Sequence, residues 1–548
     1  MNVHPTHDRV DQVLQRYAEP GSAGCALAVI DNGRIVYKQG YGLANLELDV
    51  PILPSTVFNI GSMAKQFTAF AIALLEAEGT LTLQDDMRKY LPEMHDYGET
   101  ITIRHLIHHT SGLRGSFPEL LALAEWRDTD TTTTEDVFRL LCAQRELNYR
   151  PGDEYLYVNS NYVLLALICE RVSGQSFAAL CEERVFAPLE MTRTFINGSC
   201  YKLIPGRASG YYENDDGSWA NAPLVDSVVG PTNVYSTVED LARWDENAYA
   251  GRVGGLAVVQ RILKPGRLND GTVLDYAFGL QVGPAHRHRG WQMIEHGGGQ
   301  GGYGSWMVRF PERRLSVVVL FNLFLWSMRD YAIRVADLFL EDHHAWEPAP
   351  QITDVGPKSE AAEEPGAEQL ESMAGTYYDP RRGAVREVVF TEGQLQWQGL
   401  ELVPKSATRF YFRDAPETEV EFVLPAEQSP ARLTLTGPEG EYRYQQVNKV
   451  SPTAAELAEY AGRYYSPELD LVWTLVAAED HLVAKRRKFV DSKLTPLFAD
   501  AFSDDWQPLL GYPTTYLVRF ERDSGGEVSG LRVTGTRVRN LSFTRQGR

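Results

Sequence analysis

Cysteine is scarce in this chain, and the few cysteines follow no metal-binding or disulfide pattern. Five occur among 548 residues and none is spaced as Cys-x-x-Cys; they are Cys25, Cys142, Cys169, Cys181 and Cys200. Structural zinc sites need closely spaced thiols, and disulfide frameworks need an even set of them. We therefore expect reduced, structural thiols and no zinc site.

Long apolar runs and an excess of positive charge are also missing. No apolar stretch approaches the roughly 20 residues that cross a bilayer, and residues 1–9 contain no apolar core of a signal peptide. Asp and Glu outnumber Lys and Arg by 73 to 53, which gives a formal net charge of −20. This charge disfavours binding to nucleic acid or to anionic membranes. We expect a soluble, cytoplasmic protein.

Length and changes of composition predict several domains. A chain of 548 residues, 43 % of them apolar, exceeds what one hydrophobic core usually holds. Proline and glutamate are frequent over 346–369, which predicts a solvated linker. Beyond it the pattern changes to short alternating strands, and the stretch 371–380 returns in similar form at 459–467. We expect one large domain over 1–345 and two small all-β barrels over 370–450 and 451–548.

The first domain has hairpin patterns near both ends and a helical middle. The strands 25–30 and 35–37 flank an Asp-Asn-Gly turn, and 306–310 and 315–321 form a second hairpin pattern. An amphipathic helix is predicted over 328–340. These patterns predict an α+β domain, in which both ends complete one antiparallel sheet around a helical insert.

One predicted helix start combines a serine with a lysine. Ser62 and Lys65 stand three residues apart before an apolar stretch that Gly79 ends, so both project from one face, about 5–6 Å apart at Cβ. A lysine without its proton could take one from the serine hydroxyl, and the helix N-terminus would favour developing negative charge. The pattern alone is common. Ser199 and Lys202 repeat it, but Pro205 prevents a helix there.

Two later stretches carry further polar candidates. In Tyr157-Val158-Asn159 the outer two residues alternate along a predicted extended piece, so both point the same way. His296-Gly297-Gly298 begins a run with five glycines in seven residues, which lets another backbone or a substrate approach closely. The triplets 212–214 and 288–290 match these patterns incidentally, the first in an acidic loop and the second without the glycine run.

A pair of histidines could in principle hold a metal. His105 and His109 are four residues apart, which would place them on one helical face. No carboxylate at ligand spacing accompanies them, and packing or hydrogen bonding is the better interpretation. We expect no metal and no cofactor.

Three of these stretches, Ser62-Met63-Ala64-Lys65, Tyr157-Val158-Asn159 and His296-Gly297-Gly298, resemble in order and spacing the motifs of penicillin-recognising serine hydrolases. That family includes class C β-lactamases, DD-peptidases and related esterases. Flanking stretches such as His109-Thr110-Ser111-Gly112-Leu113 match as well, and the resemblance covers roughly 8–340. Two β-domains behind such a domain further resemble the D-aminopeptidase branch. The implied fold is a β-lactamase/transpeptidase-like catalytic domain followed by two barrels.

The resemblance implies a role for each motif residue. Ser62 would attack a carbonyl and form an acyl-enzyme, while Lys65 and Tyr157 would take its proton and pass it to the leaving group; which of the two is the base stays open. Asn159 would hold the substrate amide and Lys65. The backbone N–H groups of Ser62 and Gly299 would form the oxyanion hole. The third motif contributes two more residues: His296 to catalysis and Gly298 to substrate binding.

The third motif departs from that of β-lactamases, where Lys-Thr-Gly engages a substrate carboxylate. His296 offers a weaker, pH-dependent charge, so β-lactam hydrolysis is not expected and substrates without a carboxylate fit better. A D-aminopeptidase must also hold an ammonium group. In that branch a loop of the last domain reaches the cleft, and the candidate loop 484–494 is basic with Asp491 as its only acid. Either Asp491 binds the ammonium, or the loop meets an anionic group or is merely a solvated hairpin.

The sequence thus predicts a serine hydrolase that acts through an acyl-enzyme on small amides, peptides or esters, with D-aminopeptidase as its most specific form. The enzymatic alternatives are a β-lactamase, a DD-carboxypeptidase or a short-chain esterase. A ligand sensor that keeps the fold without catalysis is the alternative from another class. The expected partner is a small-molecule or peptide substrate, with no nucleic acid and no membrane, and a homodimer is left open.

Overall fold

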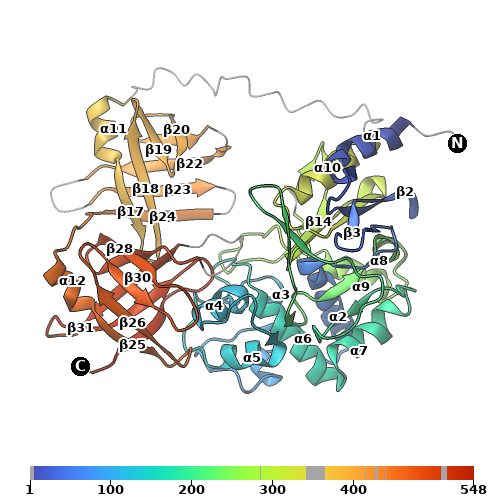
Figure 1. The fold of residues 1–548 in the computed structure, drawn as a ribbon, viewed down its shortest axis with the longest axis horizontal. Helices are drawn as coiled ribbons and strands as arrows, with labels where there is room; N and C mark the ends of the chain where they lie inside the picture. Colours follow the sequence, from blue (N-terminus) through green and yellow to red (C-terminus); the bar gives the residue numbers. More distant parts are fainter. Residues whose placement is uncertain are drawn as a thin grey trace. The chain divides into compact units, whose positions relative to one another are not determined.

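The computed structural model describes residues 5–283, 286–340, 365–413, 415–425, 430–437, 440–507 and 515–547. These residues form two compact units (Figure 1). The described residues as far as Leu340, except Ala122–Arg127, make up the first unit. Those from Pro365 onward, together with Ala122–Arg127, make up the second.

A five-stranded antiparallel sheet forms the centre of the first unit. Its order is β14-β15-β16-β1-β2, and the strands are β1 Cys25–Asp31, β2 Arg34–Tyr41, β14 Ile294–Gln300, β15 Tyr303–Phe310 and β16 Leu315–Phe321. Both predicted hairpins are present, and the first turns through Asn32 and Gly33, which both have positive φ. Because β1 pairs with β16, the two ends of the domain complete one sheet, as predicted.

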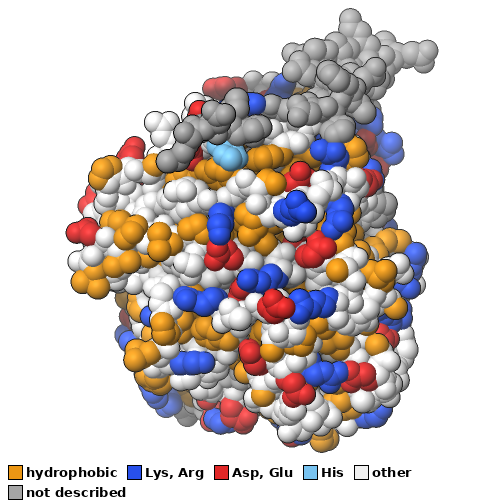
Figure 2. Space-filling model, turned by 90° about the vertical axis from the view of Figure 1, so that its right-hand side faces the viewer, with side chains coloured by type: hydrophobic (Ala, Val, Ile, Leu, Met, Phe, Trp, Pro, Cys, Tyr) orange, Lys and Arg blue, Asp and Glu red, His pale blue; other side chains and the backbone are white. Residues whose placement is uncertain are grey.

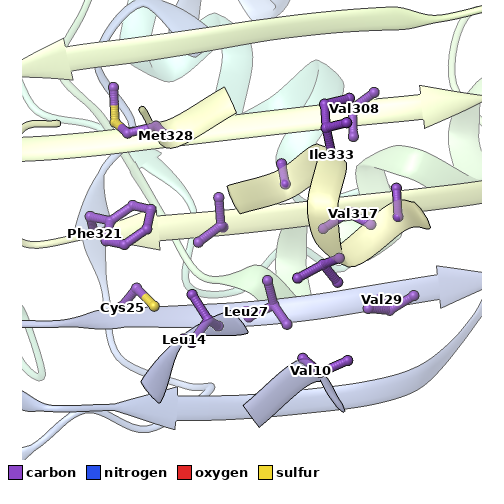
Figure 3. Close-up of a cluster of buried hydrophobic side chains, with 14 of the residues drawn as sticks. Val10, Leu14, Cys25, Leu27, Val29, Val308, Val317, Phe321, Met328 and Ile333 are labelled. Carbon is purple, nitrogen blue, oxygen red and sulfur yellow. The ribbon is translucent and has the colours of Figure 1, made fainter. Parts of the chain in front are cut away.

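One face of this sheet is covered by α1 (Pro5–Val13) and α10 (Met328–Leu340). Alternate residues of β1, among them Leu27, face the same cluster as Val10 and Leu14 from the N-terminal segment and Ile333 from α10 (Figure 3). This period of two follows from the pleat of a strand, which sends successive side chains to opposite faces. The cluster ties the first and last helices of the unit to the sheet.

The helices of the middle region carry the site. The long apolar helix α2 (Lys65–Ala77) packs against α6 (Asn159–Ser173) and α9 (Gly255–Ile262), while α8 (Val238–Ala250) packs on β1 and β16. Residues of α2 from Lys65 to Leu75 are all buried, which is typical of a helix surrounded by other elements. Three shorter helices also belong to this region: α3 Ile103–Ile107, α5 Thr134–Cys142 and α7 Phe177–Cys181. The short helix α4 (Leu121–Leu123) falls at the boundary with Ala122–Arg127, which belong to the second unit.

The second unit contains two closed eight-stranded barrels (Figure 1), which confirms the predicted all-β character. The first comprises β17 Gly375–Asp379, β18 Ala384–Thr391, β19 Gln394–Trp397, β20 Leu400–Pro404, β21 Arg409–Phe412, β22 Ala415–Val423, β23 Arg432–Gly437 and β24 Gly440–Val447. The second comprises β25 Gly462–Ser466, β26 Leu471–Ala477, β27 Leu482–Lys485, β28 Ser492–Phe498, β29 Ala501–Asp504, β30 Tyr516–Arg522, β31 Val528–Thr534 and β32 Leu541–Arg545.

The internal repeat has a structural cause. Each barrel opens with a short helix, α11 (Ala367–Met373) or α12 (Ala454–Tyr460), that leads into its first strand. The fully buried Tyr377 donates to the carbonyl of Met373 at 2.8 Å, and Tyr464 donates in the same way to Tyr460 at 2.7 Å. In each repeat, the first tyrosine of the Tyr-Tyr pair therefore fixes the end of the short helix to its barrel.

Other sequence predictions concern the rest of the chain. Residues 346–364 of the predicted linker 346–369 lie outside the described residues. The helix α11 begins at Ala367, within the end of the predicted linker. The five cysteines are all described and all free.

No single described helix is long and apolar enough to cross a membrane; by length and composition only the bent pair 159–173 and 177–186 might do so together. On the face in Figure 2, charges of both signs alternate without a continuous patch of either.

Candidate active site

Ser62 lies in a single 3₁₀ turn, Gly61–Ala64, that runs directly into α2. The turn is fixed from two sides. The Asn59 side chain accepts a hydrogen bond from the backbone N–H of Gly61 at 2.7 Å, and the Ser305 hydroxyl of β15 donates to the carbonyl of Ile60 at 2.7 Å. Ser62 itself is half-buried, so its hydroxyl is held at a defined place that remains accessible.

Lys65 follows at the first position of α2 and is fully buried. Its Nζ lies 3.0 Å from Ser62 Oγ, 2.8 Å from Asn159 Oδ1 and 3.1 Å from the carbonyl oxygen of Pro231, so the neutral amine can donate to the last two and accept from the serine hydroxyl. Three neutral oxygens from three separate segments therefore fix the amine beside the serine. The contact between Ser62 Oγ and Lys65 Nζ is short enough for a proton to pass directly from one side chain to the other.

Tyr157 and Asn159 reach the same place from the start of α6. Val158 is the extended N-cap and Asn159 the first helical residue, so the prediction that both polar residues lie on one extended piece is wrong for Asn159. Lys65 Nζ nevertheless lies 4.7 Å from the centroid of the Tyr157 ring and contacts Asn159 directly. The structure thus brings together the first two predicted motifs.

The glycine run of β14 lies against the serine turn. A methyl group added at Gly298 would lie 2.2 Å from the carbonyl oxygen of Ile60 and 2.5 Å from the backbone nitrogen of Ser62. A methyl group at Gly61 would lie 2.6 Å from the nitrogen of Gly299. Only glycine permits this approach, which the glycine run predicted. The backbone nitrogens of Ser62 and Gly299 are therefore neighbours, which supports their assignment to an oxyanion hole.

His296 is held at both ring nitrogens. Its Nδ1 lies 2.6 Å from the carbonyl oxygen of Gly297, and its Nε2 lies 3.2 Å from the hydroxyl of Tyr276. Burial, with the charge of Lys65 as a second cause, lowers the pKa of His296 to about 4. The ring is therefore neutral near pH 7. Because a carbonyl can only accept, Nδ1 carries the hydrogen and Nε2 accepts from Tyr276.

The histidine pair in the middle region has separate structural roles. His105 belongs to a capping box, where its Nδ1 accepts from the backbone N–H of Thr102 at 3.2 Å. His109 lies beyond the end of α3 with a φ of 57°. Its Nδ1 accepts from the backbone N–H of Val158 at 3.3 Å, and its ring lies 4.4 Å from that of Tyr157. The two histidines share no helical face, and packing with hydrogen bonding is confirmed as their role.

Sequence reasoning missed two groups of supporting residues. Tyr276 is fully enclosed and contacts the rings of His109 and His296, but no pattern in the sequence marks it. The second group is a buried network around Asp226, whose carboxylate accepts from Asn233 and Gln300. Asn59 donates in turn to Asn233 at 3.1 Å, which links the end of β14 to the serine turn.

The incidental matches lie elsewhere. Lys202 is exposed and stacks on Phe195, while His288 Nε2 contacts Asp337 at 2.7 Å. Among the described residues, no three His, Cys, Asp or Glu side chains gather as metal ligands do.

Asp491 belongs to the second unit, where it is exposed on the loop between β27 and β28. The interpretation of this loop as a merely solvated hairpin is wrong for Arg486. That side chain is buried between Trp473 and Trp506 and pairs with Asp504. Binding of an ammonium group by Asp491 stays a prediction.

The family model described as beta-lactamase matches residues 10–340, which contain all three motifs. The chain belongs to this family. Penicillin-binding protein 4* of Bacillus subtilis (strain 168) is 29 % identical over 435 residues, which cover 73 % of this chain and 90 % of that protein. The D-aminopeptidase of Brucella anthropi is 24 % identical over 551 residues, covering 98 % of this chain and 97 % of that enzyme.

Solved structures share the fold. The octameric penicillin-binding protein homologue from Pyrococcus abyssi superposes with a TM-score of 0.55 at 22 % identity, covering 81 % of this chain and 100 % of that one. A D-amino acid amidase from Ochrobactrum anthropi SV3 gives 0.53 at 19 % identity, covering 62 % of this chain and 100 % of the amidase. These likenesses confirm the β-lactamase/transpeptidase-like fold, and the family match over residues 10–340 confirms the predicted resemblance.

Proposed function

We propose that this protein hydrolyses small amides or peptides of D-amino acids through an acyl-enzyme on Ser62. The observation that carries the proposal is the 3.0 Å contact between Lys65 Nζ and Ser62 Oγ in a site where Lys65 is buried and fixed. A hydroxyl becomes a useful nucleophile only when a base beside it can take its proton.

The reaction follows from the arrangement of groups. Ser62 Oγ attacks the substrate carbonyl while its proton passes to Lys65 or Tyr157, and the carbonyl oxygen gains negative charge. The backbone N–H groups of Ser62 and Gly299 stabilise that charge, an effect worth about 3–4 kcal/mol per donor in related chemistry. The proton then moves to the departing amine as the C–N bond breaks. A water molecule then attacks the acyl-enzyme and gives one proton to Lys65 or Tyr157. The ester bond to Ser62 Oγ breaks, Oγ takes that proton back, and the carboxylic acid is released.

Two observations favour an uncharged amide as the substrate group near the third motif. His296 is neutral near pH 7 and both its nitrogens are occupied, so it presents no cation to a substrate carboxylate. The D-aminopeptidase of Brucella anthropi matches the chain over nearly its whole length, both barrels included. We extend the specificity of that enzyme to this chain as part of the proposal, with Asp491 as the ammonium-binding residue.

The proposal also covers the compartment, the binding partners and the oligomeric state of the protein. We propose a cytoplasmic enzyme that binds neither nucleic acid nor membranes, as its net charge of −20 favours, and the sequence leaves a homodimer open. Size-exclusion chromatography with light scattering tests the oligomeric state. A monomer, or an octamer like the homologue from Pyrococcus abyssi, would contradict the homodimer.

The test compares four substrates with the wild-type protein and with Ser62→Ala. These are D-alanine p-nitroanilide, its N-acetylated form, its L-isomer and p-nitrophenyl acetate. We expect a strong preference for the free D-amine and a loss of several orders of magnitude in kcat for Ser62→Ala. The variant Asp491→Asn should raise KM for the free amine but not for the N-acetylated substrate.

Other outcomes would redirect the assignment. Turnover of the ester alone would indicate a short-chain esterase, and rapid hydrolysis of a chromogenic cephalosporin would indicate a β-lactamase. Unchanged hydrolysis by Ser62→Ala would exclude Ser62 as the nucleophile. If the wild-type protein neither turned over any of these substrates nor reacted with a serine-directed phosphonate, the chain would be a ligand sensor.

A further inference from the structure

The second unit contains a cleft between its two barrels, with a volume of about 240 Å³. Both barrels contribute walls. Arg382–Arg386, Tyr442 and Tyr444 come from the first barrel. The second barrel contributes Leu497, Ser503, Thr515–Leu517, Thr534–Thr536 and Arg539. A ligand in this cleft would touch both barrels at once.

The barrels are in firm contact beside the cleft. Tyr378 of the first barrel packs with Ala501 and Leu517 of the second in a small buried cluster. Arg519 of the second barrel donates to the Tyr378 hydroxyl at 2.7 Å, and the backbone N–H of Val450 donates to the carbonyl of Leu497 at 3.3 Å. The walls of the cleft are therefore held by packing and by hydrogen bonds rather than by a single chain connection.

The charge of the cleft is of one sign. Three of its lining residues are arginines, namely Arg382, Arg386 and Arg539, and none of the described lining residues is acidic. The carboxylate of Asp379, which is 2 % exposed and is not part of the lining, lies 3.3 Å from Arg382. The charged side chains that line the described part of the cleft are therefore all arginines.

The remaining lining suits an organic anion. Tyr442 supports the guanidinium of Arg382 face-on at 4.3 Å, while Ser503 and Thr536 offer hydroxyl groups. Guanidinium groups bind carboxylates and phosphates with paired, charge-assisted hydrogen bonds, and aromatic rings pack against a flat apolar body. A cleft of this volume holds a small molecule and excludes a folded domain.

We propose that the cleft between the barrels binds a small organic anion, whose carboxylate or phosphate group is held by Arg386 and Arg539. This site is separate from the Ser62 site and does not depend on the hydrolytic activity. Because the ligand would touch both barrels, binding would stabilise their association and raise the melting temperature of the protein.

The test uses the full chain and three anions: benzoate, citrate and inorganic phosphate, each titrated by calorimetry and by thermal unfolding. Sodium chloride at matched ionic strength and the neutral isostere benzamide are the ligand controls. Arg386→Gln removes one charge from the half-buried wall, and Thr536→Glu adds a carboxylate at an exposed position of the same cleft. Arg443→Gln is the matched control, because Arg443 lies on the first barrel with an 80 % exposed side chain paired with Glu441.

We expect saturable binding of at least one anion, weakened about tenfold or more in Arg386→Gln and Thr536→Glu and unchanged in Arg443→Gln. Preference for benzoate or citrate would identify a carboxylate ligand, and preference for phosphate a phosphorylated one. The proposal is overturned if no anion binds saturably below about 10 mM, or if all three variants bind as the wild type does. Hydrolysis of the amide substrates should be the same in all three variants, so failure of one proposal leaves the other intact.

Discussion

The hydroxyl of Tyr276 lies 3.2 Å from Nε2 of His296 and donates its hydrogen to it. The opposite nitrogen of the same ring is occupied by the carbonyl of Gly297 at 2.6 Å. A residue that the third motif places at the edge of the site is thus neutral, fixed in one tautomer and without a free donor toward the substrate. At the position where β-lactamases carry a lysine that attracts a substrate carboxylate, this chain carries a neutral histidine.

The variant Tyr276→Phe tests this positioning role. Loss of the hydroxyl removes a hydrogen bond that favours the neutral ring, so the pKa of His296 should rise by about 0.5–1 unit from its present value of about 4. We expect kcat/KM to fall about tenfold and its acid limb to move to higher pH. The pH profile of kcat/KM for D-alanine p-nitroanilide measures both effects. A lower rate with an unmoved acid limb would indicate a purely structural role.

Lys65 should be indispensable for chemistry. Its Nζ is the nitrogen fixed beside Ser62 Oγ, and proton transfer by such a group contributes about 10²–10⁴-fold. We therefore expect Lys65→Gln to lower kcat by at least a hundredfold with a smaller change in KM. The matched control is Lys202→Gln in the other Ser-x-x-Lys stretch, where Lys202 is exposed. Equal losses in the two variants would contradict the assignment of the Ser62 motif.

Gly298 should tolerate no side chain. A methyl group there would collide with the carbonyl of Ile60 and the backbone nitrogen of Ser62, at 2.2 Å and 2.5 Å, both of which are rigid backbone atoms. Gly298→Ala should therefore separate the strand from the serine turn and lower kcat by about a hundredfold, the effect of one lost oxyanion donor. Gly198→Ala is the control, because its methyl group would meet only a Val229 methyl at 3.8 Å. Full activity of Gly298→Ala would exclude the close approach.

The sequence predicted the features that local patterns encode. Ser62 and Lys65 lie three residues apart at a helix start, so their contact follows from helical geometry. The repeated Tyr-Tyr segments predicted two similar barrels because each tyrosine fixes the same helix end in each copy. Glycine at 298 predicted a close approach because no other residue permits one.

The features that the sequence did not predict depend on long-range packing. Tyr276 reaches His296 through the tertiary fold, and no local spacing relates an isolated tyrosine to a histidine twenty residues on. Asp226 is buried beside Gln300 and Asn233, although aspartate is mostly exposed in proteins and no motif marks this one. Asn159 opens α6 rather than ending the extended piece before it, because sequence patterns place helix boundaries only to within a few residues.

Buried histidines should make the stability of the first unit fall in mild acid. Burial lowers the pKa of both His108 and His296 to about 4, while an unfolded histidine titrates near 6.5. Between these values the unfolded chain binds more protons, so the free energy of unfolding decreases as pH falls, by about 2 kcal/mol per histidine at pH 5. Asp226 acts in the opposite direction, because burial raises its pKa to about 6. Its proton stabilises the native state as pH falls from 6 toward 4.

The variant His108→Gln isolates one of these contributions without touching the catalytic groups. His108 is 5 % exposed and its ring nitrogens face the carbonyls of Arg104 and Lys264. We expect the variant to be less stable at pH 7, but to lose about 2 kcal/mol less than the wild type between pH 7 and pH 5. Urea unfolding at several pH values measures the difference. Parallel curves for the two proteins would mean that His108 is protonated equally in the folded and unfolded chains, and that acid acts on this unit through other groups.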